Sequence, residues 1–247
     1  MQSDLLTIAA LGAYPLSVLT GFAVQDTSRS EAIMATEGDW VADQARALLE
    51  DMPVQAFKVG NLVSPENVAE VADVLTDYPE VPVVFSPVLP GGVDSEAEED
   101  MIAAVCELLL PLSTVLVLRG ELALRLASDD EEQDSELSSS ESARRLLEFG
   151  ASQVLLTGVH EPGPQVINTL YGHAGVLRTD AWERLPGGFR GAGDTLSAAL
   201  ACFLAQGMEL SAAVHAAQAY TWQTLAQGWR LGMGHSLPNR FCSWTRP

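Results

Sequence analysis

The chain has 247 residues, of which 47% are hydrophobic, and a formal net charge of −20. So acidic a protein repels phosphate backbones, which argues against nucleic acid and anionic membrane surfaces as partners. The length and hydrophobic content are typical of one folded domain with a full core, not of a disordered chain. The 3 cysteines, at positions 106, 202 and 242, are widely spaced and odd in number. They predict a reducing compartment, the cytoplasm, without a disulfide framework.

The first apolar stretch, from Leu5 to Val24, has about the length of a membrane span. However, Asp4 stands at its head, no basic residue precedes it, and Pro15 divides it. We therefore interpret the stretch as a helix over Ser3–Ala13 followed by a β-branched strand over Pro15–Val24. A signal peptide or a membrane anchor is not expected.

Strand-like and helix-like segments then alternate along the chain. Continuous apolar runs between turn residues predict buried strands at Val54–Val59, Val81–Phe85, Thr114–Leu118 and Gln153–Thr157, and a hairpin is expected around Tyr171–Gly175. Amphipathic runs predict helices at Asp39–Glu50, after the cap Ser64, at Met101–Leu110 and at Arg119–Ala127. A solvated acidic loop is expected at about 128–141. The alternation predicts a single α/β domain over residues 1–247, with a mostly parallel central sheet and helices on both faces.

The stretch Pro186–Leu200 places a glycine-rich loop directly before an alanine-rich helix. Glycine permits positive φ and close approach of a ligand, and the first amides of a helix lack intrahelical partners, so such a junction binds anions. From Gly188 to Thr195 the sequence matches the phosphate-binding pattern G-x-x-x-x-G-K-[ST], except that Asp194 replaces the lysine. A carboxylate there predicts a general base that faces an acceptor hydroxyl, while neighbouring amides hold the phosphoryl group. Alternatively, Asp194 only caps the helix or interacts with its dipole.

Ligands of parallel α/β sheets bind at the carboxyl ends of the strands. The residues at the predicted strand ends should therefore converge with Asp194: Gln25, Gly60-Asn61, Ser86-Pro87-Val88 and Thr157-Gly158. Asn61 can equally be a turn residue, and Arg190 can contact either a phosphate or solvent. The 4 histidines show no metal-ligand spacing, so a zinc site is not expected.

Several longer motifs occur in a recognisable order: DLLTIAALGAYPLSVLTGFAVQDT, AFKVGNL, VPVVFSPVL, LLPLSTV, VLLTGVH, FRGAGDTLSAAL and GMGHSLPNRF. In order and spacing the chain resembles, end to end, the hydroxymethylpyrimidine/phosphomethylpyrimidine kinases of thiamin biosynthesis, within the ribokinase-like superfamily. The resemblance implies a three-layer α/β/α sandwich. It also implies phosphorylation of 4-amino-5-hydroxymethyl-2-methylpyrimidine and of its monophosphate, with ATP and Mg²⁺, by a homodimer.

The resemblance also implies roles for individual residues. The aminopyrimidine pocket would contain Asp4, Gln25, Asn61 and Val88. The anion hole would be formed by Gly191, Ala192 and Gly193, and Asp194 falls where this family usually has cysteine and the wider superfamily has its aspartate base. The nucleotide side would contain Thr157, Gly158 and His160.

The chain also departs from the family pattern. The family begins with a strand and a GSDPSGGAGIQAD-type loop, whereas Met1-Gln2-Ser3-Asp4 stands at the matching IQAD. We therefore expect a fold that lacks the family's first strand, and a reading frame that starts upstream of Met1. Ser86 replaces a metal-site aspartate, and Glu121 lies only adjacent to the position of a second acid, so metal ligands stay unassigned. Two alternatives remain open: a catalytically impaired pyrimidine-binding homologue, and a pyridoxal-type vitamin B6 kinase.

Overall fold

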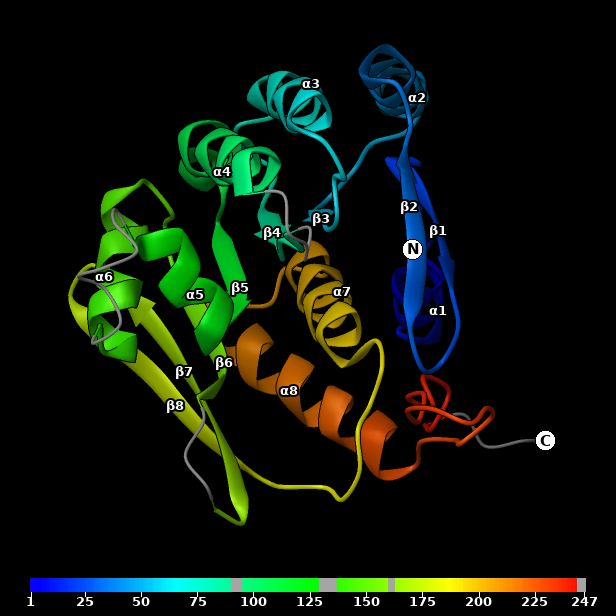
Figure 1. Cartoon of the computed structure of the whole chain (residues 1–247), viewed down its shortest axis with the longest axis vertical. Helices are drawn as coiled ribbons and strands as arrows, with labels where there is room; N and C mark the ends of the chain where they lie inside the picture. Colours follow the sequence, from blue (N-terminus) through cyan, green and yellow to red (C-terminus); the bar gives the residue numbers. More distant parts are fainter. Residues whose placement is uncertain (90–94, 129–136, 160–162, 244–247) are drawn as a thin grey trace.

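The computed structural model describes residues 1–89, 95–128, 137–159 and 163–243. Its main sheet is 6-stranded, in the order β3-β4-β5-β6-β7-β8 (Figure 1). The strands are β3 (Phe57–Val59), β4 (Val83–Phe85), β5 (Val115–Arg119), β6 (Val154–Val159), β7 (Gln165–Gly172) and β8 (Gly175–Glu183). Strands β3 to β6 run parallel, and β7 and β8 form an antiparallel hairpin. The predicted mostly parallel sheet and the predicted hairpin are both confirmed.

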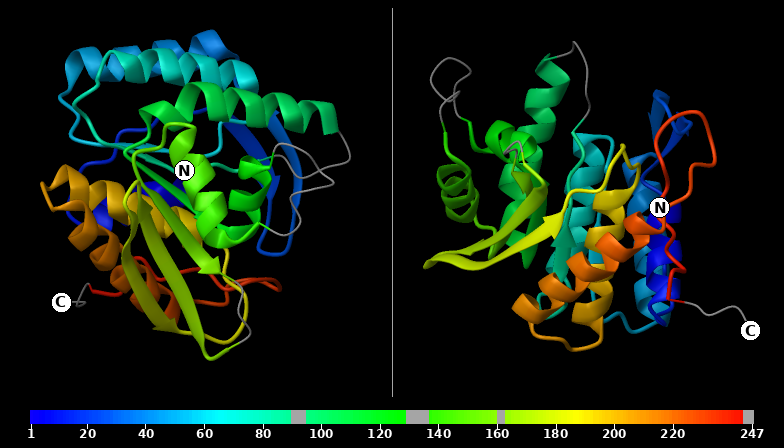
Figure 2. Two further views of the ribbon diagram at one scale, coloured as in Figure 1. Left: turned by 90° about the vertical axis from the view of Figure 1, so that its left-hand side faces the viewer. Right: turned by 90° about the horizontal axis from the view of Figure 1, so that it is seen from below.

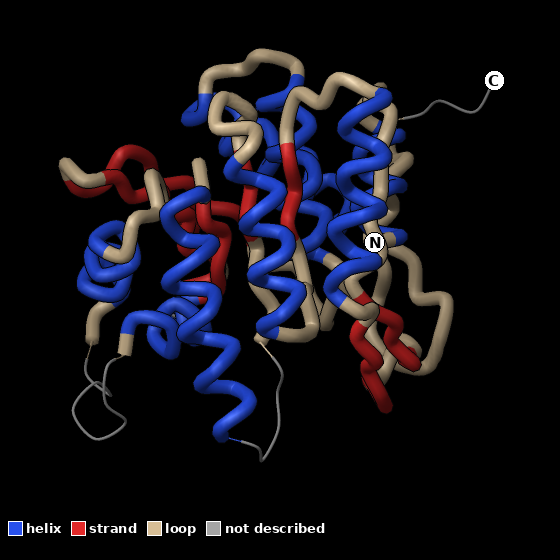
Figure 3. Tube along the Cα trace, turned by 90° about the horizontal axis from the view of Figure 1, so that it is seen from above, coloured by secondary structure: helices blue, strands red, loops and turns tan. Residues whose placement is uncertain are grey.

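Helices cover both faces of the sheet (Figure 3). One face carries α3 (Pro65–Thr76), α4 (Ser95–Ala104), α5 (Gly120–Ala127) and α6 (Ser139–Glu148), and α2 (Gly38–Asp51) packs against α3. The opposite face carries α1 (Gln2–Ala10), α7 (Ala192–Ala205) and α8 (Leu210–Ala226). After α4 the helix continues as a π-helical turn over Val105–Leu109 and a 3₁₀ turn over Leu110–Leu112. Within the described ranges, no helix has both the length and the apolar composition needed to cross a membrane.

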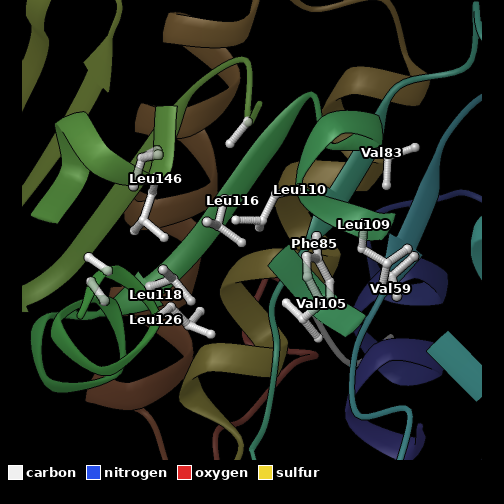
Figure 4. Close-up of a cluster of buried hydrophobic side chains, with 14 of the residues drawn as sticks. Val59, Val83, Phe85, Val105, Leu109, Leu110, Leu116, Leu118, Leu126 and Leu146 are labelled. Carbon is white, nitrogen blue, oxygen red and sulfur yellow. The ribbon is translucent and has the colours of Figure 1, made fainter. Parts of the chain in front are cut away.

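Side chains that alternate along the strands build a separate core on each face. Phe85, Leu116 and Leu118 point toward α3–α6, where they pack with Leu109, Leu126 and Leu146 (Figure 4). Their neighbours Val84, Val115 and Val117 point toward α7 and α8. Because both faces are covered, the central strands read as continuous apolar runs.

The predicted strand over Pro15–Val24 is wrong in extent and in position. The strand that forms, β1, covers Gly21–Gln25 and pairs with β2 (Ser30–Ala35) in a separate antiparallel sheet, set apart from the main one (Figure 3). Residues 13–20 form no strand, and their polar groups have other partners. The Leu19 amide donates to the Gln44 side chain, and the Thr20 hydroxyl donates to the Asn61 carbonyl. A β-branched run becomes a strand only where another backbone lies alongside it.

The predicted acidic loop over 128–141 also needs correction at its carboxyl end, whereas residues 129–136 lie outside the described part of the chain. Helix α6 begins at Ser139, and Ser138 and Glu141 form a reciprocal capping box at its start. Such a Ser-x-x-Glu box satisfies two amides that would otherwise lack partners at the helix start. The predicted cap of α3 is confirmed, since the Ser64 hydroxyl accepts from the Asn67 amide at 3.3 Å.

Candidate active site

The glycine loop ends where α7 begins. Gly191 is the N-cap of the helix, with φ of +83°, and it makes no side-chain cap hydrogen bond. The cap therefore leaves the amides of Ala192 and Gly193 without a side-chain acceptor, at the positive end of the helix dipole. A Cβ added at Gly193 would have no heavy atom within 4 Å, so the backbone there is open to close approach. This geometry is suited to binding an anion.

Asp194 lies in the first turn of α7, and its carboxylate points toward a buried cation. Its Oδ1 is 3.9 Å from Nζ of Lys58, the middle residue of β3, whose side chain is 8% exposed. The same ammonium lies 3.1 Å from Oδ1 of Asp4, in the first turn of α1. The other oxygen of Asp4 lies 3.2 Å from the amino group of Met1. The structure thus brings Asp4 and Asp194 together around Lys58, which our sequence reasoning did not single out.

A second buried cation, Arg240, lies against the residues next to these two carboxylates. Its Nε donates to the Thr195 hydroxyl, and its Nη2 donates to the Ser3 hydroxyl, both at 3.0 Å. Burial lowers the pKa of the Arg240 guanidinium, and Asp194, Tyr220 and Asp4 oppose that effect. A Cβ at Gly191 would lie 2.8 Å from Nη2, so this position requires glycine for packing as well as for its positive φ. Arg240 belongs to the sequence GMGHSLPNRF, in which no local feature distinguishes it.

Gln25 reaches the glycine loop from the end of β1. Its Oε1 accepts a hydrogen bond of 2.7 Å from Nη2 of Arg190. Arg190, for which the sequence left a phosphate or solvent as partner, thus contacts Gln25. The C-terminal segment holds the same region, because the His235 amide donates to the Thr27 carbonyl and the Ser236 amide donates to the Gly188 carbonyl. The β1–β2 turn, the glycine loop and the C-terminal segment therefore lie side by side (Figure 2).

The remaining predicted residues lie at the carboxyl ends of neighbouring parallel strands, and their hydrogen bonds go to the scaffold. The Asn61 side chain accepts from the Val63 amide at 3.1 Å, as a turn residue does, and Val88 follows β4 with 48% of its surface exposed. The Thr157 hydroxyl donates to the Leu118 carbonyl at 3.0 Å, and the Gly158 amide, at φ of +61°, donates to the Asn168 side chain at 3.0 Å. His160 lies outside the described residues.

Within the described part of the chain, no group of 3 or more His, Cys, Asp or Glu side chains is arranged to hold a metal ion. A metal site made entirely of such side chains is therefore absent from those residues. Magnesium commonly needs only one or two carboxylates when phosphates and water complete its shell. Glu121, in the first turn of α5 directly after β5, is a carboxylate at the edge where the parallel strands end.

Sequence comparison relates the whole chain to one family. The phosphomethylpyrimidine kinase family model matches residues 1–239. The thiamine biosynthesis bifunctional protein ThiED of Geobacter sulfurreducens is 34% identical over 244 residues, which are 97% of this chain and 49% of that protein, so the chain spans about half of its length. The hydroxymethylpyrimidine/phosphomethylpyrimidine kinase of Rhizobium meliloti is 31% identical over 247 residues, covering 99% of this chain and 92% of the relative. That of Escherichia coli is 30% identical over 248 residues, with the same coverage of 99% and 92%.

Solved structures show the same fold. Pyridoxal kinase of Bacillus subtilis, determined as an ADP complex, superposes with a TM-score of 0.85 at 23% identity, over 98% of this chain and 92% of that one. A phosphomethylpyrimidine kinase from Clostridium difficile superposes with a TM-score of 0.69 at 24% identity, over 89% and 90% of the two chains. Identities this low establish the fold alone, whereas the sequence matches establish the family. The chain is a member of the phosphomethylpyrimidine kinase family, with the fold of the ribokinase-like vitamin kinases.

Proposed function

We propose that this chain transfers the γ-phosphoryl group of ATP to 4-amino-5-hydroxymethyl-2-methylpyrimidine, to the monophosphate of that pyrimidine, or to both, in thiamin biosynthesis. Family membership supports the reaction class. The observation that carries the proposal is the position of Asp194, a carboxylate in the first turn of α7 beside the open backbone of Gly193. A base and an anion-binding helix terminus in one turn are what phosphoryl transfer to a hydroxyl needs.

In the proposed reaction, Asp194 accepts the proton of the substrate's hydroxymethyl group. The hydroxymethyl oxygen bonds to the γ-phosphorus of ATP, and ADP leaves. The amides of Ala192 and Gly193, with the loop turned by Gly191, stabilise the negative charge on the phosphoryl oxygens. For the second phosphorylation the acceptor is a phosphate oxygen, which carries no proton to remove when it is ionised. We therefore expect the base to matter more for the first step than for the second.

The proposed pyrimidine pocket uses Asp4, Gln25, Asn61 and Val88. Arg190 occupies Oε1 of Gln25, which leaves the Gln25 amide nitrogen as a donor for a ring nitrogen of the substrate. A carboxylate oxygen of Asp4 can accept from the exocyclic amine. Val88, 48% exposed at the end of β4, offers apolar surface to the ring.

For the nucleotide, we propose that the triphosphate lies across the start of α7, and that Thr157, Gly158 and His160 contribute to nucleotide binding. Magnesium, when bound, would neutralise phosphate charge. Glu121, adjacent in sequence to the position of the family's second metal-site acid, would be the carboxylate available to hold it. The start of α7 contributes backbone amides to this end of the site.

We further propose a cytoplasmic homodimer. The cysteines at 106, 202 and 242 are all free thiols, which suits a reducing compartment. One face of the β1–β2 pair displays Phe22, Val24 and Met34, which are 54%, 59% and 65% exposed. Adjacent apolar side chains on an exposed strand pair suit packing against a second copy of the chain. Sedimentation velocity of the Phe22→Ser variant should show a shift toward monomer, and an unchanged dimer would remove this face as the contact.

The reaction is tested by supplying the pyrimidine and ATP to the purified protein and following both phosphorylated products by mass spectrometry. Asp194→Asn removes the base without changing the size of the side chain, and it should lower kcat for the first step by about 10²–10⁴-fold. Asp73→Asn is the matched control, because Asp73 is an exposed carboxylate on α3 that pairs with Arg46 on α2. Equal rates for the Asp194→Asn variant and the wild type would refute the proposed base.

A second candidate function, pyrimidine binding without transfer, is favoured by Ser86, which stands where the family has a metal-site aspartate. Calorimetric titration separates the two. Binding of the pyrimidine without magnesium-dependent binding of ATP would support the binding protein, and normal affinity for magnesium-ATP would support the kinase. Pyridoxal, supplied in competition with the pyrimidine, tests the vitamin B6 alternative in the same assay.

A further inference from the structure

Lys58 is an unusual residue for its position in the fold. It is the only lysine of the chain, and it lies in the middle of β3. Its neighbours Phe57 and Val59 pack into the core on the α3–α6 face, so Lys58 points to the opposite face, between α1 and α7. Its side chain is 8% exposed. A lysine is almost never buried unless it is paired, because removal of its charge from water is costly.

The partners of Lys58 are the two acidic residues of the candidate active site. Its ammonium lies 3.1 Å from Oδ1 of Asp4 and 3.9 Å from Oδ1 of Asp194. Asp4 belongs to α1 and Asp194 to α7, so a single charge connects a strand with two helices. Asp194 is much the more exposed of the two acids, with 44% of its side chain accessible against 17% for Asp4.

The backbone of β3 is adapted to this ammonium. Gly60 directly follows the strand, and a Cβ placed there would lie 2.7 Å from Nζ of Lys58. Glycine at this position therefore makes the room in which the ammonium lies. An ammonium is a compact point charge, whereas a guanidinium is a broad planar fork, so arginine would not occupy the same space.

We propose that Lys58 is a positioning residue of the reaction. Its ammonium holds Oδ1 of Asp194 toward α1, so that the remaining oxygen of the carboxylate is presented to the acceptor hydroxyl. The same ammonium keeps Asp4 beside the pocket. This inference rests on the proposed role of Asp194 as the base. A buried ion pair that merely fastens α1 to the sheet would instead alter stability and leave the chemical step unchanged.

Steady-state kinetics of Lys58→Met separate these two roles. Methionine keeps the length and packing of the side chain but has no charge. We expect kcat to fall by about 10–100-fold, as misorientation of a catalytic group does, with KM for ATP within about threefold. The double variant Lys58→Met/Asp194→Asn should have a kcat no lower than that of Asp194→Asn alone, because Lys58 acts on the chemical step through Asp194. Multiplying effects, or a wild-type kcat in Lys58→Met, would overturn the proposal.

Arg46→Met is the matched control for the loss of a paired cation. Nη2 of Arg46 lies 2.6 Å from Asp73, but both side chains are exposed. This variant should keep the wild-type kcat. Gly60→Ala supplies a second route to the same displacement, because it retains the lysine and crowds its ammonium. Its kcat should also fall, and a wild-type kcat would contradict the proposed packing of the ammonium.

A spectroscopic test works even if the wild type proves inactive. Because Lys58 is the only lysine, protein labelled with [¹³C]lysine gives a single Cε–Hε resonance. Asp194→Asn should shift that resonance, and Asp180→Asn, a buried carboxylate on another strand, should leave it in place. An unmoved resonance in Asp194→Asn would overturn the contact. Absence of turnover in the wild type together with a shifted resonance would overturn only the proposed kinase activity.

Discussion

The helices on the two faces of the main sheet pack in different ways. On the face of α3–α6, the core consists of large aliphatic and aromatic side chains such as Phe85, Leu116 and Leu146, each at most 1% exposed. On the face of α7 and α8, much of the core is alanine and valine, and the buried charges of Lys58, Asp180 and Arg240 lie there. Small residues let helices approach closely while paired polar groups fill the remaining space. One face therefore supplies most of the apolar burial, and the other carries the charged residues of the candidate site.

The charged face contains a second network besides the one around Lys58. Asp180 on β8 accepts hydrogen bonds from Arg178 and Gln218, and its Oδ1 lies 2.8 Å from Nδ1 of His215. Burial raises the pKa of Asp180, but the hydrogen bonds from Arg178 and His215 outweigh it and hold the pKa below its ordinary value. Through Gln218 and Asn168 the network reaches the amide of Gly158, at the proposed nucleotide side. Both polar networks on this face thus lead to the candidate site.

The largest effect that tests the difference between the two faces is expected from a cavity in the core on the α3–α6 face. Leu146 on α6 is fully buried, so Leu146→Ala should lower the free energy of unfolding by about 2–5 kcal/mol. Urea denaturation measures the loss. The folded fraction should keep its wild-type kcat, because Leu146 packs in the core on the opposite face of the sheet from the charged residues of the site. A large fall in kcat per folded molecule would show that the two faces are not separate in role.

Two glycines on the face of α7 and α8 separate two effects: tight packing inside the protein and access of the phosphates to the backbone. Gly191→Ala places a Cβ at positive φ, 2.8 Å from Arg240 and 2.9 Å from Ser3, and should lower the free energy of unfolding by about 1–3 kcal/mol and also reduce activity. Gly193→Ala is the matched control, because its Cβ would lie within 4 Å of no heavy atom among the described residues beyond its own chain neighbours and helix backbone. It should leave the melting temperature close to that of the wild type and still raise KM for ATP, if the phosphates approach this backbone. Equal melting temperatures for the two variants would contradict the packing around Arg240.

The smallest effect on stability, and one that depends on pH, is expected at Asp180. A depressed pKa means that the unfolded chain binds more protons as the pH falls, so the stabilisation by Asp180 is present above about pH 4 and lost as the pH falls through the folded-state pKa. Asp180→Asn should lower the free energy of unfolding by about 1–2 kcal/mol at pH 7. Compared with the wild type, it should lose less stability between pH 7 and pH 3. Parallel curves for the two proteins would contradict the role of the charged form.

Local signals predicted much of the fold and the start of the helix that carries Asp194. Apolar runs located the parallel strands, Ser64 located a helix start, and the glycine loop with Asp194 located the candidate anion site. The strand expected over Pro15–Val24 failed because a strand requires a paired backbone, and residues 13–20 bond to side chains and loop groups instead. Asn61 was expected in the pocket or in a turn, and its side-chain oxygen accepts a hydrogen bond from the Val63 amide in a turn.

The sequence alone determined the alternation of strands and helices, the helix cap at Ser64, and the glycine loop before the helix that carries Asp194. These features depend on residues a few positions apart, whose effect on the backbone is local. Only the tertiary structure decided that Lys58 is buried between Asp4 and Asp194, that Arg190 binds Gln25, and that Arg240 supports the start of α7. Arg240 and Ser3 are 237 positions apart, and no local pattern records which distant side chain will neutralise a buried charge.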